Sequence, residues 1–163
     1  MKVVHFADIH LGYRQYHRQT PTGLNQREAD IAKVFRDTID RIIELQPDLI
    51  LIAGDVFHNV RPTNPAILHA YNQFRRLVEM LPDAGIVMVA GNHDIPRTTE
   101  TMCLLGLFKS LGIHVVVDKA DWVHLRGGEV SVLSVPYAVN PRPKLEPNPS
   151  ARYNVLLIHD EVE

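Results

Sequence analysis

Cysteine is almost absent from this sequence, since its 163 residues include only Cys103. A single cysteine cannot form an intrachain disulfide, which excludes disulfide-rich secreted scaffolds and suits a reducing compartment. Long apolar runs are missing too, because no run approaches the roughly 20 residues of a membrane-spanning helix. The first residues also lack the basic and apolar segments of a secretory signal. We therefore expect a cytoplasmic protein that does not bind membranes.

An excess of charge of one sign is also lacking, because 17 lysines and arginines oppose 19 aspartates and glutamates, for a net charge of −2. A nucleic-acid binder usually has a basic surface, so the overall charge neither supports nor excludes that kind of partner. Histidine is abundant in contrast, and nine histidines are more than packing requires in a chain of 163 residues. A chain of this length fits one domain with a sizeable core.

Short apolar runs, expected as strands, alternate with longer segments of helical periodicity along the first two thirds of the chain. Asn25, with Glu28 three residues later, has the spacing of a capping box and predicts a helix that ends before Pro47. Asn64 followed by Pro65 predicts the N-cap and first residue of a second helix. Short strands are expected at 2–7, 49–53, 86–90, 115–117, 122–125, 130–135 and 153–158, with a third helix near 100–111. The β-α-β-α-β-α order predicts an α/β fold with a parallel, right-handed crossover sheet.

Four of the expected strands are followed directly by residues of the types that bind metals. The motifs are Asp8-x-His10, Gly54-Asp55 with His58, Gly91-Asn92-His93-Asp94, and His159. Open α/β sheets bind their ligands at the carboxyl ends of the strands, so these side chains are expected to meet. Each short motif alone occurs often by chance, but all of them in order after apolar strands favour a real site. Four other histidines are interpreted as structural: His5, His69, His114 and His124.

The combination of carboxylate, amide and imidazole ligands indicates which metals such a site would hold. Mixed oxygen and nitrogen donors suit manganese, iron or zinc better than calcium or magnesium. An aspartate such as Asp55 can bridge two cations through its two oxygens. Paired cations would activate water and stabilise the entering and leaving oxygens at a phosphoryl centre. A neighbouring histidine would then protonate the leaving group.

The same residues resemble those of the calcineurin-like metallophosphoesterases. The residues of these motifs most resemble those of the SbcD-type DNA-repair exonuclease branch. The resemblance lies in three segments: 7–13 (ADIHLGY), 54–58 (GDVFH) with Arg61-Pro62, and 91–94 (GNHD). Many phosphatases of the superfamily carry a second aspartate three residues after the bridging one, whereas His58 occupies that position here, as in the nuclease branch. The resemblance covers nearly the whole chain and implies an α/β fold, an αββα sandwich of the metallophosphoesterase type.

The resemblance also implies a role for each site residue. Asp8 and His10 would bind one metal, Asp55 would bridge, and Asn92 and His159 would bind the second metal. His93 would be the general acid, and His58 would help to position the phosphate. Members of the branch are two-metal DNA phosphodiesterases, with manganese expected first and iron or zinc as alternatives. They work with an SMC-like ABC-ATPase subunit, and a homodimer is compatible with the resemblance.

In the family, a Gly-His-x-His motif downstream of the strand that carries His159 completes the coordination of both metals. This motif is not found in these 163 residues. We therefore expect residues 1–163 to be a catalytic domain without its closing strands, incomplete at the C-terminus and a weak binder of the metal pair. A small-molecule phosphodiesterase or phosphatase is the alternative enzyme. A non-catalytic fragment is the alternative from another class.

Overall fold

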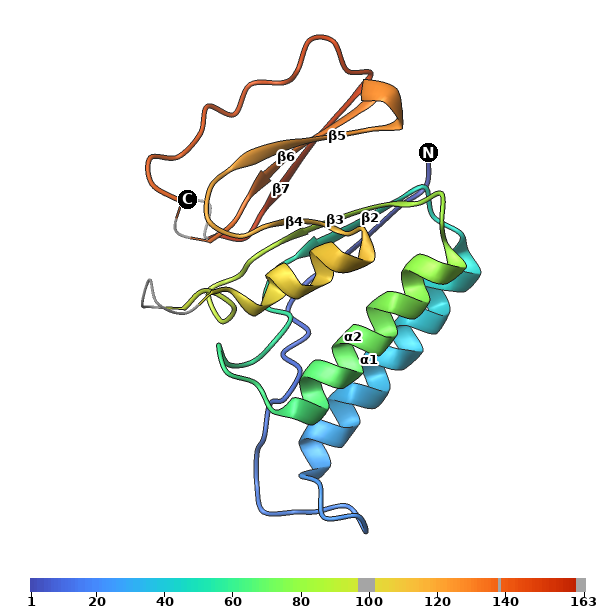
Figure 1. Ribbon diagram of the computed structural model, residues 1–163, viewed down its shortest axis with the longest axis vertical. Helices are drawn as coiled ribbons and strands as arrows, with labels where there is room; N and C mark the ends of the chain where they lie inside the picture. Colours follow the sequence, from blue (N-terminus) through green and yellow to red (C-terminus); the bar gives the residue numbers. More distant parts are fainter. Residues whose placement is uncertain (97–101, 138, 161–163) are drawn as a thin grey trace.

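The computed structural model describes residues 1–96, 102–137 and 139–160. Two β-sheets pack face to face, and the longer helices lie together against the outer face of the first sheet (Figure 1). The first sheet has the order β1-β2-β3-β4 and is parallel throughout, while the second has the order β5-β6-β7. The expected α/β fold is confirmed. Among the described residues only the first sheet carries a helical layer, so the second helical layer of the expected αββα sandwich is not seen.

The first sheet is built from Val3–Phe6 (β1), Leu49–Ala53 (β2), Gly85–Val89 (β3) and His114–Val116 (β4). Leu49 pairs with Val3 on one side and with Gly85 on the other, so β2 lies in the middle of the sheet. All five residues of β2 are buried, as expected for a strand covered on both faces. This burial explains why the strand reads as a continuous apolar run.

The first helix, α1 (Gln26–Leu45), begins where the sequence predicts. The side chain of Asn25 accepts hydrogen bonds from the backbone N–H groups of Arg27 and Glu28. Glu28 itself does not play the capping-box role expected of it. Its carboxylate is buried and instead accepts bonds from Arg14 Nε at 2.7 Å and from Thr63 Oγ at 2.8 Å. Glu28 therefore joins the loop after β1 to the start of the second helix.

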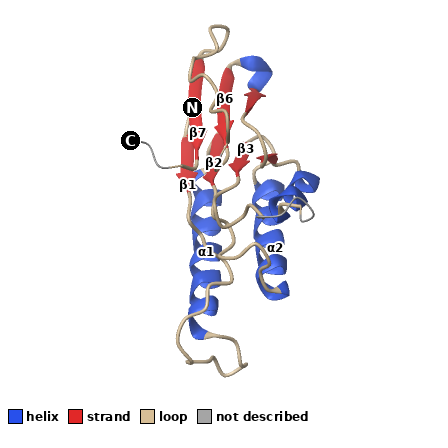
Figure 2. Ribbon diagram, turned by 90° about the vertical axis from the view of Figure 1, so that its left-hand side faces the viewer, coloured by secondary structure: helices blue, strands red, loops and turns tan. Residues whose placement is uncertain are grey.

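The second helix, α2 (Asn64–Met80), has a different N-cap from the one expected. Thr63 is the cap, and its hydroxyl accepts a bond from the backbone N–H of Ala66 at 3.3 Å. Asn64 is the first helical residue, so the prediction of Asn64 as N-cap was wrong by one position. Figure 2 shows α1 and α2 side by side beneath the sheet, where the Phe35 and Phe74 rings meet with centroids 5.3 Å apart.

The third expected helix is a 3-10 helix, η1 (Leu104–Leu111), closed by Gly112 at a φ of 86°. The part of the prediction between 97 and 101 lies outside the described residues. Among the described residues, no helix is both long and apolar enough to cross a bilayer.

The second sheet consists of Asp121–Leu125 (β5), Val130–Val135 (β6) and Tyr153–Ile158 (β7). The short helix η2 (Arg126–Gly128) closes the antiparallel β5–β6 hairpin, and β7 then adds in parallel to β6. Apolar side chains from the two sheets form the core between them: Leu49, Leu51, Ala53, Val87, Val89, Val116, Val123, Val130, Val132 and Leu157. This packing places the end of β7 beside the ends of β1 and β2.

Candidate metal centre

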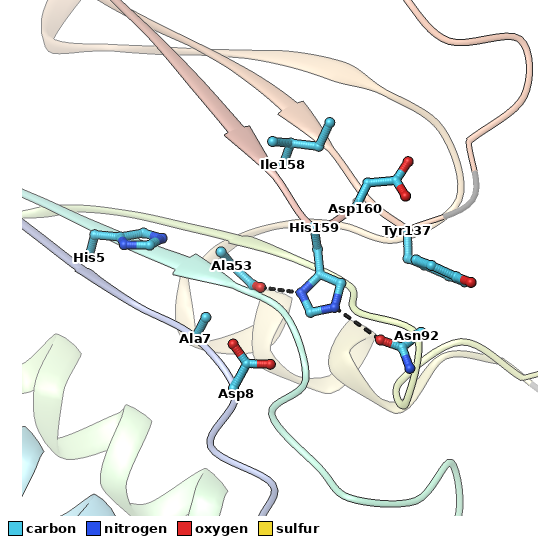
Figure 3. A pocket seen from close by; sticks show the side chains of 9 residues that line it. All are labelled: His5, Ala7, Asp8, Ala53, Asn92, Tyr137, Ile158, His159 and Asp160. Carbon is cyan, nitrogen blue, oxygen red and sulfur yellow. Dashed lines mark hydrogen bonds between the residues drawn. The ribbon is translucent and has the colours of Figure 1, made fainter. Parts of the chain in front are cut away.

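The carboxyl ends of strands from both sheets surround one cavity of about 590 Å³. Figure 3 shows the side chains that line it, which come from segments far apart in the sequence. His159 follows β7, Asp8 follows β1 and Asn92 follows β3. The full lining is His5, Ala7, Asp8, Ala53, Asn92, Tyr137, Ile158, His159 and Asp160. Three of the predicted site residues therefore meet in one cavity.

The backbone at these strand ends adopts conformations that L-residues rarely take. Asp8, His10 and Asp55 have φ values of 57°, 50° and 52°. A non-glycine residue in this left-handed region costs free energy, and such strain clusters at functional sites. Two backbone bonds hold the turns in register, from the N–H of Asp8 to Gly54 O at 3.1 Å and from the N–H of His10 to Asp55 O at 3.0 Å. The strained turns thus support each other.

Asp55 occupies the middle of the site. Its side chain is only 4 % exposed, and its two oxygens face different histidines. Oδ2 lies 3.7 Å from His10 Nε2, and Oδ1 lies 3.7 Å from His159 Nε2. Asp8 Oδ1 lies 3.9 Å from His10 Nε2, and one atom each of Asp8, Asp55 and His159 lie within 4.8 Å of one another. Asp55 therefore lies close to two of the other predicted ligands, His10 and His159, through different oxygens.

The contact between His159 and Asn92 tests whether a cation fits here. His159 Nδ1 donates to the carbonyl oxygen of Ala53 at 2.5 Å, so the neutral ring has a lone pair on Nε2. That Nε2 lies 3.1 Å from Asn92 Oδ1, which also offers a lone pair. A cation between the two atoms would accept both lone pairs. Without one, the ring must take a second proton or the Asn92 amide must turn its NH₂ toward Nε2. Ligands that are each about 2.1 Å from one cation lie about 3–3.5 Å apart, and this pair fits.

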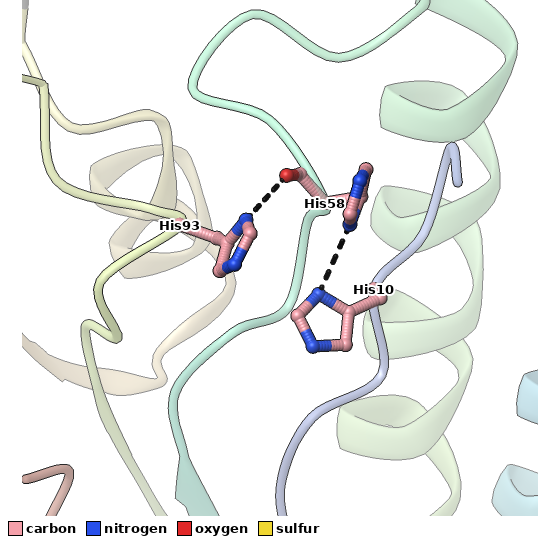
Figure 4. Close-up of side chains that lie close together, drawn as sticks. All are labelled: His10, His58 and His93. Atoms are coloured by element: carbon pink, nitrogen blue, oxygen red, sulfur yellow. Dashed lines mark hydrogen bonds between the residues drawn. The ribbon is translucent and has the colours of Figure 1, made fainter. Parts of the chain in front are cut away.

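A second group of ligand atoms lies beside the first. Nitrogens of His10, His58 and His93 lie within 4.8 Å of one another (Figure 4). His58 Nδ1 is 3.4 Å from His10 Nδ1, and His93 Nδ1 donates to the backbone carbonyl of His58 at 2.6 Å. Burial, followed by the neighbouring His10 and His93 rings, lowers the pKa of His58. The Tyr13 ring packs on His58 with centroids 4.5 Å apart.

The residue before Asn92 is Gly91, and the close approach of the Asp55 turn to its backbone explains why it is a glycine. A Cβ on Gly91 would lie 2.1 Å from Asp55 Oδ1 and 2.5 Å from Asp55 N. Gly54, with a φ of 81°, in turn faces Gly91, because a Cβ on Gly54 would lie 2.6 Å from Gly91 N. Only glycine lets these two turns come this close.

The sequence analysis assigned no role to Asp94, yet the structure buries it next to the site. Only 3 % of the residue is exposed. Its carboxylate accepts backbone bonds from Gly91 at 3.0 Å, Phe57 at 3.1 Å and Val56 at 3.3 Å. Burial raises the pKa of Asp94 to about 6, although the bonds from Gly91 and Phe57 oppose that shift. No local sequence signal separates a buried carboxylate of this kind from an exposed one.

The other histidines lie largely where the sequence predicts. His69 Nε2 bonds to the carbonyl oxygen of Ala32 and links α2 to α1. His124 Nδ1 bonds to Ser131 Oγ across the β5–β6 hairpin. His5 is exposed on β1, and its side chain lines the cavity. His5 therefore borders the candidate site without belonging to either group of ligand atoms.

Comparisons with known proteins show which family the chain belongs to. The family model described as calcineurin-like phosphoesterase matches residues 1–160. A "DNA double-strand break repair protein Mre11" from Methanocaldococcus jannaschii is 36% identical over 137 residues, which cover 84% of this chain and 35% of that protein. Its namesake from Methanococcus maripaludis is 36% identical over 138 residues, with the same coverage of both chains. The namesake from Sulfolobus acidocaldarius is 28% identical over 167 residues, covering 99% of this chain and 42% of that protein.

The chain thus spans about a third of the length of the first two of these relatives. The family match extends over nearly all of the sequence, and it includes every strand whose carboxyl end reaches the cavity. The protein belongs to the calcineurin-like phosphoesterase family, and its sequence is similar to those of the Mre11 repair proteins.

Proposed function

We propose that residues 1–163 carry the catalytic site of a metal-dependent phosphodiesterase that cuts DNA and holds two manganese ions, with iron or zinc as alternatives. The arrangement of Asp55 is the observation on which this proposal depends. Its Oδ2 lies 3.7 Å from His10 Nε2, and its Oδ1 lies 3.7 Å from His159 Nε2. A buried carboxylate between two sets of ligand atoms suits a bridge between two cations.

The proposed ligands divide between the two oxygens of Asp55. Asp8 and His10 would hold one cation, and Asn92 and His159 would hold the other. When bound, the two cations would supply an activated water and would stabilise charge on the oxygens of the phosphoryl group. The bond from His159 Nδ1 to Ala53 O fixes this ring with Nε2 toward the site.

His93 and His58 would handle the phosphate and the proton. Because His93 Nδ1 donates to His58 O, its Nε2 is the ring atom that can carry a second proton. From that atom His93 would protonate the leaving oxygen and return to its neutral form. His58 lies between His10 and Tyr13, in the position where many phosphatases of the superfamily have an aspartate.

The relatives and His58 together favour DNA over small phosphomonoesters as the substrate. The names of those relatives refer to repair of DNA double-strand breaks. We propose that a longer protein containing this chain acts with an SMC-like ABC-ATPase subunit. A small-molecule phosphodiesterase or phosphatase is the competing candidate, and a chain without catalytic activity is a third.

A comparison of substrates tests this proposal. With manganese, a longer protein that contains this chain and the complete site should cleave single-stranded DNA and bis-p-nitrophenyl phosphate faster than p-nitrophenyl phosphate. Residues 1–163 alone should hydrolyse little or none of the three. Asp55→Asn provides the control for contaminating nucleases, since it removes one oxygen of the bridge. The ratio of the DNA and diester rates to the monoester rate distinguishes a nuclease from a phosphatase, because weak metal binding would lower all three rates together. Preferred hydrolysis of the monoester would favour a phosphatase, and activity that survives Asp55→Asn would contradict the proposed site.

Two further variants separate metal binding from proton transfer. His93→Ala should leave metal content nearly unchanged and lower turnover by roughly 10²–10⁴-fold, the usual contribution of a general acid. Asp55→Ala should lose metal first, because both cations share its carboxylate. Equal depletion of metal in the two variants, measured by elemental analysis, would contradict this division of roles.

A further inference from the structure

We infer that Asp94 is a positioning residue whose carboxylate joins the two turns that carry the metal-binding side chains, an inference that rests on the proposed metal centre. Asp94 contributes to neither group of candidate ligand atoms. It is nevertheless 97 % removed from solvent, since only 3 % of the residue is exposed. A carboxylate buried this deeply needs hydrogen-bond donors, and here the protein backbone supplies them.

The donors to Asp94 come from both turns. Oδ2 accepts from the N–H of Gly91 at 3.0 Å and from the N–H of Val56 at 3.3 Å. Oδ1 accepts from the N–H of Phe57 at 3.1 Å. Gly91 opens the turn that carries Asn92 and His93, whereas Val56 and Phe57 lie between Asp55 and His58. One side chain therefore spans two turns that are more than 30 positions apart in sequence.

Asp55 makes the matching contact in the opposite direction. Its Oδ1 accepts from the backbone N–H of His93 at 2.9 Å. Each turn thus supplies a carboxylate that binds the backbone of the other turn. The backbone carbonyl of His58 also accepts from His93 Nδ1 at 2.6 Å. Asp94 makes its hydrogen bonds between the two turns on the buried side, away from the cavity.

The two oxygens of Asp94 accept from different backbone groups, and replacing the carboxylate by an amide distinguishes the two sets of bonds. Asp94→Asn retains one acceptor oxygen, which can keep the two bonds to Gly91 and Val56. The amide NH₂ would then face the N–H of Phe57, where both groups are donors. The segment between Asp55 and His58 should therefore shift, while the Gly91 turn keeps its bond. We expect the variant to fold, because two of the three hydrogen bonds to this side chain remain.

Histidine ring signals in metal-free protein, observed by nitrogen-15 NMR, provide the first readout. Asp94→Asn should shift the ring signals of His58 and His93 and leave those of His69 and His124 in place. Asp83→Asn, at an exposed residue of the α2–β3 loop, is the matched control and should shift none of them. A merely structural role would lower thermal stability without this localised pattern.

Cobalt(II) titration, followed by its visible absorption, provides the second readout. Loss of a group that orients ligands typically weakens metal binding 10–100-fold, and we expect Asp94→Asn to bind cobalt more weakly by that factor. Unchanged ring signals would overturn the inference, as would failure of Asp94→Asn to fold or cobalt binding equal to wild type. Failure of the wild-type chain to bind cobalt would instead contradict the proposed metal centre, and the ring signals would still decide the role of Asp94.

Discussion

Replacement of Gly91 by alanine tests the closest contact in the site. An added Cβ would lie 2.1 Å from Asp55 Oδ1 and 2.5 Å from Asp55 N. Since carbon and oxygen atoms in contact are rarely closer than about 3 Å, the carboxylate or the turn must move by about 1 Å. Metal ligands tolerate displacements of about 0.5 Å, so this movement should disrupt the bridge.

The energetic cost follows from the same contact. Overpacking against groups that cannot move freely costs about 1–3 kcal/mol, and in a domain of this size each kcal/mol lowers Tm by about 2–4 °C. We therefore expect Gly91→Ala to melt about 2–12 °C below wild type and to bind manganese at least about tenfold more weakly.

Gly106→Ala is the matched control, because no described atom lies within 4 Å of a Cβ added there. Gly106 is within η1, so alanine should leave Tm unchanged or raise it. Calorimetric melting and manganese titration of the three proteins supply both quantities. A Gly91→Ala chain that binds manganese like wild type would refute the reasoning, whether or not its Tm falls.

Two further predictions concern the helices. Thr63→Ala should lower the free energy of unfolding by at least about 0.5–2 kcal/mol in urea titrations, because it removes the α2 cap and also the hydroxyl that donates to buried Glu28. Asn64→Ala should change it by less than about 0.5 kcal/mol. The opposite order would restore Asn64 as the cap. Burial lowers the pKa of His69, so the folded state favours the neutral ring. The contribution of this ring to the free energy of unfolding should be fully present above about pH 6.5 and should be lost as the pH drops through the folded pKa. His69→Gln should remove that part of the pH dependence, and the exposed-site control His114→Gln should retain it; equal pH profiles for wild type and His69→Gln would contradict the assignment.

The strands and their polar ends could be predicted because their signals are local. Leu49–Ala53 is apolar at every position and fully buried, and Asp55 follows it within two residues. Parallel pairing then places the carboxyl ends of β1, β2 and β3 at one edge without further information. His159 was harder to place, since it depends on β7 lying in a second sheet that packs on the first.

What the sequence did not indicate depends on contacts between distant segments. Asp94 receives bonds from Val56 and Phe57, 38 and 37 positions away, and no spacing rule connects them. Glu28 has capping-box spacing, but Thr63, 35 positions away, takes up one of its carboxylate oxygens. Local patterns describe one element at a time, so a carboxylate that bridges two elements has no signature in either of them.

The Asp55 bridge is the central claim, and manganese binding tests it most directly. Electron paramagnetic resonance of free manganese during titration measures the affinity of wild type, Asp55→Asn and the exposed-site control Asp83→Asn. We predict saturable binding to wild type and Asp83→Asn, and binding at least about tenfold weaker to Asp55→Asn. Equal affinity of all three proteins would contradict the proposal that Asp55 holds the cations.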